Sequence, residues 1–317
     1  MKFEKILIIG IDKDFLFKET WQNLNNLCKE IIVVEQESSE VDTNLANTDC
    51  ILVTLGATVD KDMMDKAPNL KYIGAFSTGY GRIDTEYATS KGITVCNIAG
   101  YSTQGVAELA FALILENIRD VSRAKVQAKN GNYSEATFKG TEIANKKFGI
   151  IGLGSIGTRI AEIASNGFNA DVMYYSRNRK ADKENDKLVY QGDVKTLVQE
   201  SDFLSLNLAY NNETEKFINK ELMNEIKPGA IVINLSPMEL IDFEALSKRL
   251  QVGDITFILD HSDELTEEQA TQLSKYENCI MYPPIGYITD ESKVLMQEIF
   301  VDNIINYFND TPTNKVN

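Results

Sequence analysis

The sequence predicts an α/β protein with two Rossmann-like, doubly wound parallel-sheet domains and a cleft between them. Two series of short apolar segments alternate with helical stretches, which is typical of parallel sheets covered by helices on both faces. The segment Phe148–Gly157, FGIIGLGSIG, adds a glycine-rich loop between a strand and a helix. The length of 317 residues is enough for two domains of roughly 100–200 residues each.

Apolar segments of strand length recur through the first third of the chain. Stretches with helical spacing separate them, and we therefore expect the apolar segments to lie side by side in one parallel sheet. The predicted strands are Lys5–Gly10, Glu30–Val34, Cys50–Leu55, Leu70–Ala75 and Thr94–Asn97.

A long segment with an apolar middle, roughly 103–130, predicts a helix between the two series of strands. The chain ends in an amphipathic helix over about 291–308, which is too isolated to stand alone and is expected to pack on the first domain. The first domain is therefore discontinuous, with residues 1–99 and 288–317, and residues 100–287 form the second. The strands predicted for the second domain are Phe148–Ile151, Asp171–Tyr175, Phe203–Leu208, Ala230–Asn234, Thr256–Asp260 and Cys279–Tyr282.

Composition limits the partners that this chain can have. The net charge of −15 and the isoelectric point near 4.7 argue against nucleic acid, whose phosphates bind clustered lysine and arginine. The apolar run Leu109–Leu115 is far shorter than a membrane span, and the N-terminal run is too short for a signal peptide. The cysteines are scattered without a C-x-x-C pair, so we expect no disulfide framework, no metal site and a cytoplasmic protein. They are Cys28, Cys50, Cys96 and Cys279.

The glycine-rich loop has the G-x-G-x-x-G spacing in the order strand, loop, helix. We expect Gly152 to make the tight turn, Gly154 to let the backbone approach a pyrophosphate, and Gly157 to let the helix pack closely on the strand. Ser155 and Ile156 would begin the helix, whose free N–H groups bind phosphate. The loop therefore predicts a dinucleotide site, and the alternative is a glycine-rich turn without a ligand.

The residues after the second strand of this unit indicate which dinucleotide is bound. A Rossmann unit that binds NAD has an acidic residue there, about 20 residues after the glycines, for the ribose 2′-hydroxyl. This chain has Ser176, Arg177 and Arg179 instead, and guanidinium groups suit a 2′-phosphate. The sequence therefore predicts NADP(H) in preference to NAD(H). The alternative is that the arginines are exposed loop residues and that the protein does not discriminate.

From about residue 50 to 308 the chain resembles the D-isomer-specific 2-hydroxyacid dehydrogenases. Several segments carry the resemblance in the family's order, and they include 70–84, 91–97, 140–157 and 227–230. The resemblance implies that the first domain is a flavodoxin-like substrate domain and the second an NAD(P)-binding Rossmann domain. It also implies a homodimer and a small anionic or carbonyl substrate.

The resemblance further assigns roles to particular residues. Thr78 and Gly79 match the loop that binds the substrate carboxylate in this family. The remaining matched positions are expected to contact the cofactor, with the aspartate at the nicotinamide. These positions are Leu208, Thr214, Leu235 and Asp260.

The three catalytic groups of the family are not retained. An arginine normally binds the substrate carboxylate and carbonyl, a histidine transfers the proton, and a glutamate orients that histidine. The flanking residues of segment 234–242 fix the register, and they place Pro237 at the arginine position. Pro284 stands at the histidine position and Asp263 at the glutamate position. A proline can replace neither the positive charge nor the proton donor.

His261, the one histidine of the sequence, is a candidate for a relocated proton donor. It follows the predicted strand end at Asp260, and strand alternation would place it on the same side as Asp263. The alternative is that His261 fills an apolar position beside the nicotinamide without transferring a proton. Tyr282 and Tyr287 are further candidate donors.

Two functions remain open from the sequence. The chain is either an NADP(H)-binding family member that no longer runs the standard hydride transfer, a pseudoenzyme, or an active NADPH-dependent oxidoreductase with a relocated proton donor. A structural protein without nucleotide is not favoured, because the glycine loop and the Ser-Arg-x-Arg segment are both retained.

Overall fold

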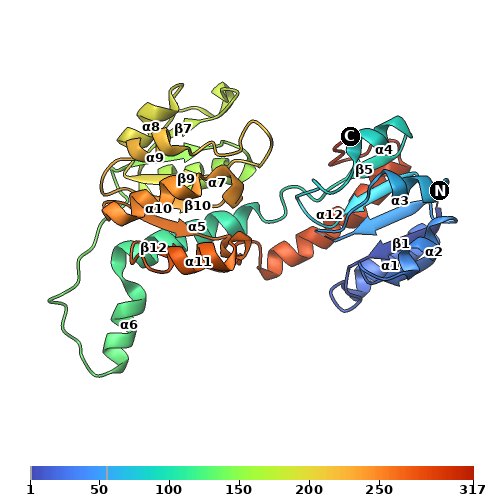
Figure 1. Cartoon of the computed structure of the whole chain (residues 1–317), viewed down its shortest axis with the longest axis horizontal. Coiled ribbons are helices and arrows are strands. Elements are labelled where there is room, and N and C mark those ends of the chain that lie inside the picture. The colour runs from blue at the N-terminus through green and yellow to red at the C-terminus, as the bar shows by residue number, and fades with distance from the viewer. Residues whose placement is uncertain (1, 55) are drawn as a thin grey trace. The chain divides into compact units, whose positions relative to one another are not determined.

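The computed structural model describes residues 2–54 and 56–317 and divides into two α/β units (Figure 1). The first unit contains the chain up to Tyr101 together with Thr289–Asn317, and the second contains Ser102–Ile288. All strand pairs in both sheets are parallel among the described residues, which confirms the predicted α/β class. Within the described residues, no helix is long and apolar enough to cross a membrane.

The first unit has a five-stranded sheet in the order β2-β1-β3-β4-β5. Its centre is apolar on both faces, as expected for strands covered by helices on both sides. The predicted strand residue Leu55 lies outside the described residues. The strands are β1 (Phe3–Ile9), β2 (Cys28–Val34), β3 (Cys50–Val53), β4 (Tyr72–Ala75) and β5 (Thr94–Cys96).

The C-terminal helix α12 (Asp290–Phe308) belongs to the first unit. Its Phe300 is buried and meets the ring of Phe76 edge-on at 4.6 Å. Its buried Gln297 accepts hydrogen bonds from the backbone N–H of Phe17 and the hydroxyl of Thr20, both at 2.7 Å. The other helices of the unit are α1 (Lys18–Leu27), α2 (Glu40–Leu45), α3 (Lys61–Lys66) and α4 (Thr85–Ser90).

The second unit has a seven-stranded sheet in the order β12-β11-β10-β9-β6-β7-β8. The edge strand β8 (Leu188–Tyr190) was not predicted, because three residues between polar segments are too short to show an alternating pattern. The remaining strands are β6 (Lys147–Ile151), β7 (Asp171–Tyr175), β9 (Phe203–Leu206), β10 (Ile231–Asn234), β11 (Thr256–Leu259) and β12 (Cys279–Met281).

The helix predicted over about 103–130 is two helices, so that prediction was wrong. Asp120 has a left-handed backbone with φ of 51°, which ends α5 (Thr103–Arg119) and starts α6 (Val121–Lys129). Aspartate adopts this conformation more readily than most residues do, and the apolar pattern does not reveal it. The described residues of α6 include no buried side chain, and Figure 1 shows this helix projecting from the second unit.

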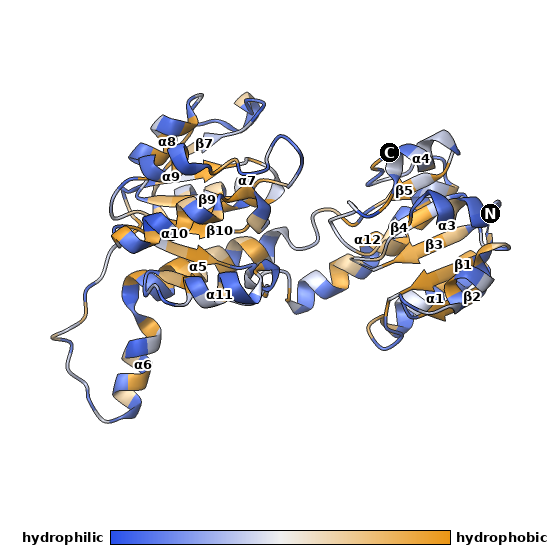
Figure 2. Ribbon diagram, viewed as in Figure 1, coloured by the Kyte–Doolittle hydropathy of each residue, from blue (hydrophilic) through white to orange (hydrophobic). Residues whose placement is uncertain are grey.

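The other helices of the second unit cover the two faces of its sheet. Figure 2 shows the apolar strands between helices with mixed surfaces. A short π-helical turn at Ile163–Gly167 follows the end of the first of these helices, the one at Ser155–Glu162. They are α7 (Ser155–Glu162), α8 (Val194–Glu200), α9 (Lys220–Glu225), α10 (Phe243–Val252) and α11 (Glu267–Leu273).

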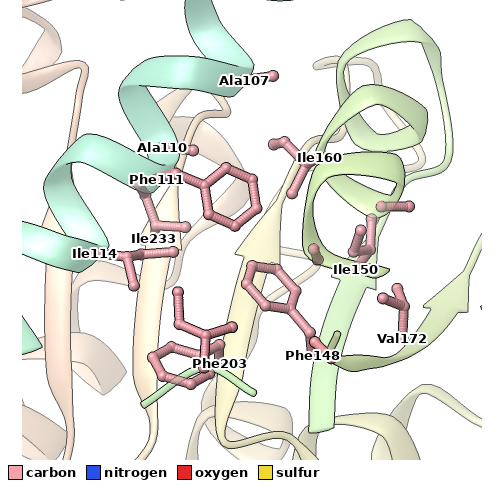
Figure 3. Packing of buried hydrophobic residues seen from close by; sticks show 14 of the residues in the cluster. Ala107, Ala110, Phe111, Ile114, Phe148, Ile150, Ile160, Val172, Phe203 and Ile233 are labelled. Carbon is pink, nitrogen blue, oxygen red and sulfur yellow. The ribbon is translucent and has the colours of Figure 1, made fainter. Parts of the chain in front are cut away.

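An aromatic cluster fixes β6 and α5 in the core of the second unit (Figure 3). Phe148 of β6 stacks on Phe203 of β9 with ring centroids 5.8 Å apart and also contacts Phe111 of α5 at 5.8 Å. Phe111 in turn stacks on Phe168 at 5.0 Å. Burial of a phenylalanine contributes roughly 1.5–3 kcal/mol, so this cluster anchors the strand that leads into the glycine loop.

Candidate functional site

The glycine loop follows β6 at the carboxyl edge of the seven-stranded sheet. β6 lies between β7 on one side and β9 on the other, so the strand order reverses at this point. In open α/β sheets, ligands bind outside the carboxyl ends of the strands at such a reversal. The loop predicted from the sequence therefore lies where this architecture binds ligands.

The three glycines of the loop occupy different environments. Gly152 has φ of 97°, and a Cβ there would lie 2.6 Å from the carbonyl oxygen of Asn207. A Cβ on Gly157 would overlap the carbonyl oxygen of Gly152. At Gly154, in contrast, a Cβ would meet no described atom within 4 Å. The loop thus combines a tight turn and close helix packing with one open position, and this geometry fits a pyrophosphate.

Helix α7 begins directly after Gly154, which is its N-cap in extended conformation. The side chain of Ser155 is exposed and that of Ile156 is half-buried. The first N–H groups of an α-helix lack partners within the helix and carry partial positive charge. An anion placed over Gly154 would therefore meet backbone donors and not a cationic side chain.

Ser176 and Arg177 follow β7. Ser176 is buried, and its hydroxyl donates to the carbonyl of Asn178 at 2.6 Å. Arg177 Nη1 donates to Glu213 Oε2 at 3.0 Å, and both side chains are mostly exposed. The sequence analysis did not predict this contact with Glu213.

Arg179 is held by Glu184, which the sequence analysis also missed. Its Nε and Nη2 donate to the two carboxylate oxygens of Glu184 at 2.8 and 2.7 Å. The guanidinium group lowers the pKa of Glu184, and the carboxylate raises that of Arg179. A glutamate five residues after an arginine is common on protein surfaces, so the sequence provided no reason to expect this pair.

The loops after β9 and β10 contain three predicted cofactor residues. The backbone N–H of Leu208 donates to the hydroxyl of Ser236, which is buried, at 2.8 Å. Leu235, next to Ser236, is buried as well. The Thr214 hydroxyl donates to the carbonyl of Ala209 at 2.8 Å and shapes its own loop. The structure brings Leu208 beside Gly152, since a Cβ on that glycine would lie 3.0 Å from its side chain.

Pro237 occupies a half-buried position in the loop after β10. The next residue, Met238, donates its backbone N–H to Glu264 Oε2 at 2.8 Å. Burial raises the pKa of Glu264, while this backbone hydrogen bond and the neighbouring His261 oppose the rise. At the position that the sequence resemblance assigns to the family's arginine, the chain therefore has an apolar ring, and a carboxylate is bound to the next residue.

His261 lies between two carboxylates after β11. Its Nδ1 is 3.9 Å from Asp263 Oδ1 and 3.8 Å from Glu264 Oε1, both beyond hydrogen-bond length. The side chain is partly exposed. The two acids are equally close, so the geometry does not single out Asp263 as the orienting partner of His261.

Asp260 is 3% exposed, and its Oδ1 finds no hydrogen-bond partner among the described residues. Its Oδ2 lies close to Gly286, because a Cβ on that glycine would be only 3.0 Å from this oxygen. Burial raises the pKa of Asp260, and the backbone N–H groups of Ile285 and Gly286 partly offset this effect. A buried acceptor without a partner is costly, and the carboxamide of a nicotinamide is a donor that fits it.

The two candidate tyrosines differ in their surroundings. Tyr282 is half-buried, and burial together with the nearby carboxylate of Glu116 raises its pKa. Tyr287 is 45% exposed. Pro284, which the sequence resemblance assigns to the family's histidine position, is half-buried. A raised pKa keeps the Tyr282 phenol protonated but makes it a weaker acid.

The Thr78–Gly79 loop follows β4 in the first unit. The buried hydroxyl of Ser77 donates to the carbonyl of Gly79 at 2.6 Å, and Asn97 Nδ2 donates to the carbonyl of Thr78 at 2.7 Å. Thr78 and Gly79 themselves are exposed. Buried polar groups thus fix the backbone of this loop and leave its surface accessible.

The parallel sheet, the reversal of strand order and the glycine loop define a Rossmann-type dinucleotide-binding protein. Residues 111–286 match the profile of the family "D-isomer specific 2-hydroxyacid dehydrogenase, NAD binding domain". The chain belongs to the NAD(P)-dependent D-isomer-specific 2-hydroxyacid dehydrogenase family. The family predicted from the sequence is confirmed.

Several proteins are similar to this chain in sequence or in structure over most of their length. A glyoxylate reductase of Thermococcus litoralis is 34% identical over 280 residues, which cover 85% of this chain and 83% of the relative. An acyclic imino acid reductase in complex with NADPH and D-Arg has a TM-score of 0.85 at 28% identity, covering 99% of this chain and 100% of that chain. D-lactate dehydrogenase from Aquifex aeolicus, complexed with NAD and lactic acid, has a TM-score of 0.82 at 26% identity and 96% coverage of both chains.

Two substitutions separate the packing role of the glycine loop from its binding role. Gly157→Ala should destabilise the second unit by about 1–3 kcal/mol or more, because the new methyl group overlaps the Gly152 carbonyl. Gly154→Ala should change the stability by no more than about 0.5 kcal/mol but weaken NADPH binding. Urea unfolding and cofactor titration measure the two effects. Wild-type stability of Gly157→Ala would contradict the close packing described above.

Asp260→Asn tests the buried carboxylate through pH. Because the pKa of Asp260 is raised, the folded state keeps this proton at pH values where the unfolded chain has lost it. This group therefore lowers stability as pH rises from the unfolded pKa, about 4, through the raised folded one. The variant lacks this loss and should melt at a higher temperature than the wild type at neutral pH, with the difference shrinking toward pH about 4. Thermal melting curves at several pH values measure this difference in Tm, and Asp186→Asn, at an exposed position, is the control. A lower Tm of Asp260→Asn than of the wild type at neutral pH would refute the argument.

Proposed function

We propose that this chain binds NADP(H) in preference to NAD(H) and does not carry out the standard 2-oxo acid reduction of its family. One observation carries the proposal: the glycine loop has the geometry for a pyrophosphate, while prolines stand at the arginine and histidine positions. On this proposal the chain is a pseudoenzyme or a divergent enzyme.

The residues present support cofactor binding along the whole carboxyl edge of the second sheet. The N–H groups at the start of α7 would bind the pyrophosphate over Gly154, next to Ser155 and Ile156. The Ser176–Arg179 segment would meet the adenosine ribose and its 2′-phosphate. Asp260 would accept from the nicotinamide carboxamide through its unpartnered Oδ1. The structural similarity to an acyclic imino acid reductase in complex with NADPH supports this cofactor.

The loss of the catalytic groups is large in energetic terms. Reduced nicotinamide, when bound, supplies a hydride to an electrophilic carbon. A 2-oxo acid also needs a cation to polarise its carbonyl, which typically contributes a factor of about 10²–10³ to the rate. It further needs an acid to protonate its oxygen, which contributes a factor of about 10²–10⁴. Pro237 and Pro284 can provide neither, because the pyrrolidine ring carries no charge and no proton donor.

A second candidate function is an NADPH-dependent reductase that acts on an imine or a related carbonyl, with His261 as proton donor. The observation that favours it is the acidic surroundings of His261, with Asp263 and Glu264 at similar distances. His261 would give its proton to the imine nitrogen. The iminium ion formed in this way carries its own positive charge, so its carbon accepts the hydride without an arginine, and nearby carboxylates stabilise the cation. The structural similarity to an acyclic imino acid reductase supports this class of substrate.

One experiment tests both functions. NADPH and NADH are titrated against the pure protein, and oxidation of NADPH is then followed with 2-oxo acids alone and with 2-oxo acids mixed with amines. We expect tighter binding of NADPH and no turnover of 2-oxo acids alone. Turnover only in the presence of an amine would select the imine reductase, and its loss in His261→Ala would identify the donor. Failure to bind either cofactor would refute the proposal.

We propose that the second unit forms a homodimer through the arm, by which we mean α6 and the residues that follow it up to Tyr133. The described residues of α6 contain no buried side chain, although Val126 is 60% exposed and Tyr133 beyond it is 81% exposed. Apolar side chains on a projecting segment are typical of an interface between copies of a chain.

The arm can be tested by light scattering after size-exclusion chromatography. The wild type should show about twice the chain mass of 35.5 kDa, and Val126→Asp combined with Tyr133→Asp should shift it toward the monomer, because buried charges weaken an apolar interface. Val252→Asp, at an exposed position of α10, is the control. A monomeric wild type would exclude the dimer.

The cytoplasmic location stays a prediction, and the state of the cysteines supports it. All four thiols are free and buried. Burial raises the pKa of Cys28 to about 11 and that of Cys279 to about 12. Such thiols are not ionised at neutral pH and react slowly, as is typical of structural cysteines in a reducing compartment.

A further inference from the structure

We infer that Glu184 and Glu213 give the two arginines after β7 different tasks: Arg177 binds the 2′-phosphate of NADP(H), and Arg179 is a structural residue that does not. The inference rests on the NADP(H) preference proposed above and makes it specific. The sequence pattern does not distinguish the two arginines as phosphate ligands, whereas in the structure they differ in the number of their hydrogen bonds and in exposure.

Arg179 is held within its own loop by two hydrogen bonds, although its side chain is 60% exposed. Two of its nitrogens donate to both oxygens of Glu184, the bidentate geometry in which an arginine–carboxylate pair is strongest. The Glu184 side chain is only 17% exposed, so solvent screens the pair little on that side. The positive charge of Arg179 is therefore balanced before any ligand arrives.

The loop around this pair is closed by a second set of contacts. The buried Tyr174 donates its hydroxyl to Glu184 Oε1 at 2.9 Å and accepts the backbone N–H of Lys180 at 2.8 Å. The guanidinium group of Arg179 lies over the ring of Tyr190, 5.7 Å from its centroid. Moving Arg179 to a phosphate would leave Glu184 without its cation in a mostly buried position, which is unfavourable.

Arg177 has one weak partner. Its contact with Glu213 is a single hydrogen bond of 3.0 Å, and the two side chains are 79% and 73% exposed. Exposed ion pairs of this kind contribute little to stability, so Arg177 can exchange Glu213 for another anion. A phosphate group carries more charge and offers several acceptor oxygens, and it therefore competes successfully with one carboxylate.

Glu213 thereby sets the strength of discrimination between the two cofactors. When NADH binds, its ribose 2′-hydroxyl offers Arg177 no charge, so the pair with Glu213 persists. When NADPH binds, its 2′-phosphate must displace Glu213 from Arg177. Glu213 is thus a specificity-determining residue that lowers NADPH affinity without affecting NADH.

The test compares neighbouring substitutions of equal size, Arg177→Met and Arg179→Met, by the ratio of Kd for NADH to Kd for NADPH. Arg177→Met should lower this ratio by about tenfold or more, since it removes a charged hydrogen-bond donor from the phosphate. Arg179→Met should change it by about twofold at most. Arg179→Met and Glu184→Gln should instead lower Tm, whereas Arg177→Met should leave Tm unchanged.

Glu213→Gln should raise NADPH affinity by about two- to fivefold and leave NADH affinity unchanged, in line with the strength of an exposed pair. In the Arg177→Met background the same substitution should have no effect, because Glu213 acts through Arg177. Binding of the fragments 2′,5′-ADP and 5′-AMP provides the same comparison for a variant with weak cofactor binding.

The outcomes separate this inference from the function on which it rests. A wild type that binds NADPH no better than NADH refutes the proposed preference. A wild type that prefers NADPH, but loses the preference equally in Arg177→Met and Arg179→Met, supports the function and overturns the division between the arginines. An effect of Glu213→Gln that survives in the Arg177→Met background overturns the role of Glu213.

Discussion

The second unit depends on how closely α7 approaches the loop that precedes it. Gly157 faces the carbonyl of Gly152 so closely that no side chain fits between them. This contact fixes the direction of α7 relative to β6, and with it the direction in which the first N–H groups of the helix point. The aromatic contacts of Phe148 anchor the other end of the same strand. Backbone geometry, and not particular side chains, therefore creates the anion-binding position.

Cofactor binding and catalysis can therefore depend on different kinds of groups. The pyrophosphate position needs glycines and a helix N-terminus, which are part of the packing of the second unit. Pro237 and Pro284, which the sequence resemblance assigns to the arginine and histidine positions of the family, stand in the loops after β10 and β12. Replacing a loop side chain removes chemistry without disturbing the sheet, since such loops contribute little to the core.

Features that depend on local sequence patterns were predictable, and features that depend on tertiary contacts were not. Strands such as β6 and β9 were predictable, because buried parallel strands are continuous apolar runs. β8 and the break at Asp120 were not, since three residues show no period and a left-handed aspartate leaves the apolar pattern intact. In the site, the glycines were predictable from their spacing. The partners Glu184, Glu213 and Glu264 were not, because side-chain pairing across loops depends on the tertiary structure and not on local pattern.

The placement of acidic residues also bears on what the site can bind. Both arginines after β7 are paired with glutamates, and His261 lies between Asp263 and Glu264. The chain carries a net charge of −15, so an anionic substrate approaches against an unfavourable field. The backbone N–H groups at the start of α7 would attract phosphate locally, whereas the charged groups near His261 Nδ1 are the carboxylates of Asp263 and Glu264. A reacting group with positive charge matches these surroundings better than a 2-oxo acid does, which is the electrostatic argument for an imine as the substrate of any reaction that this site performs.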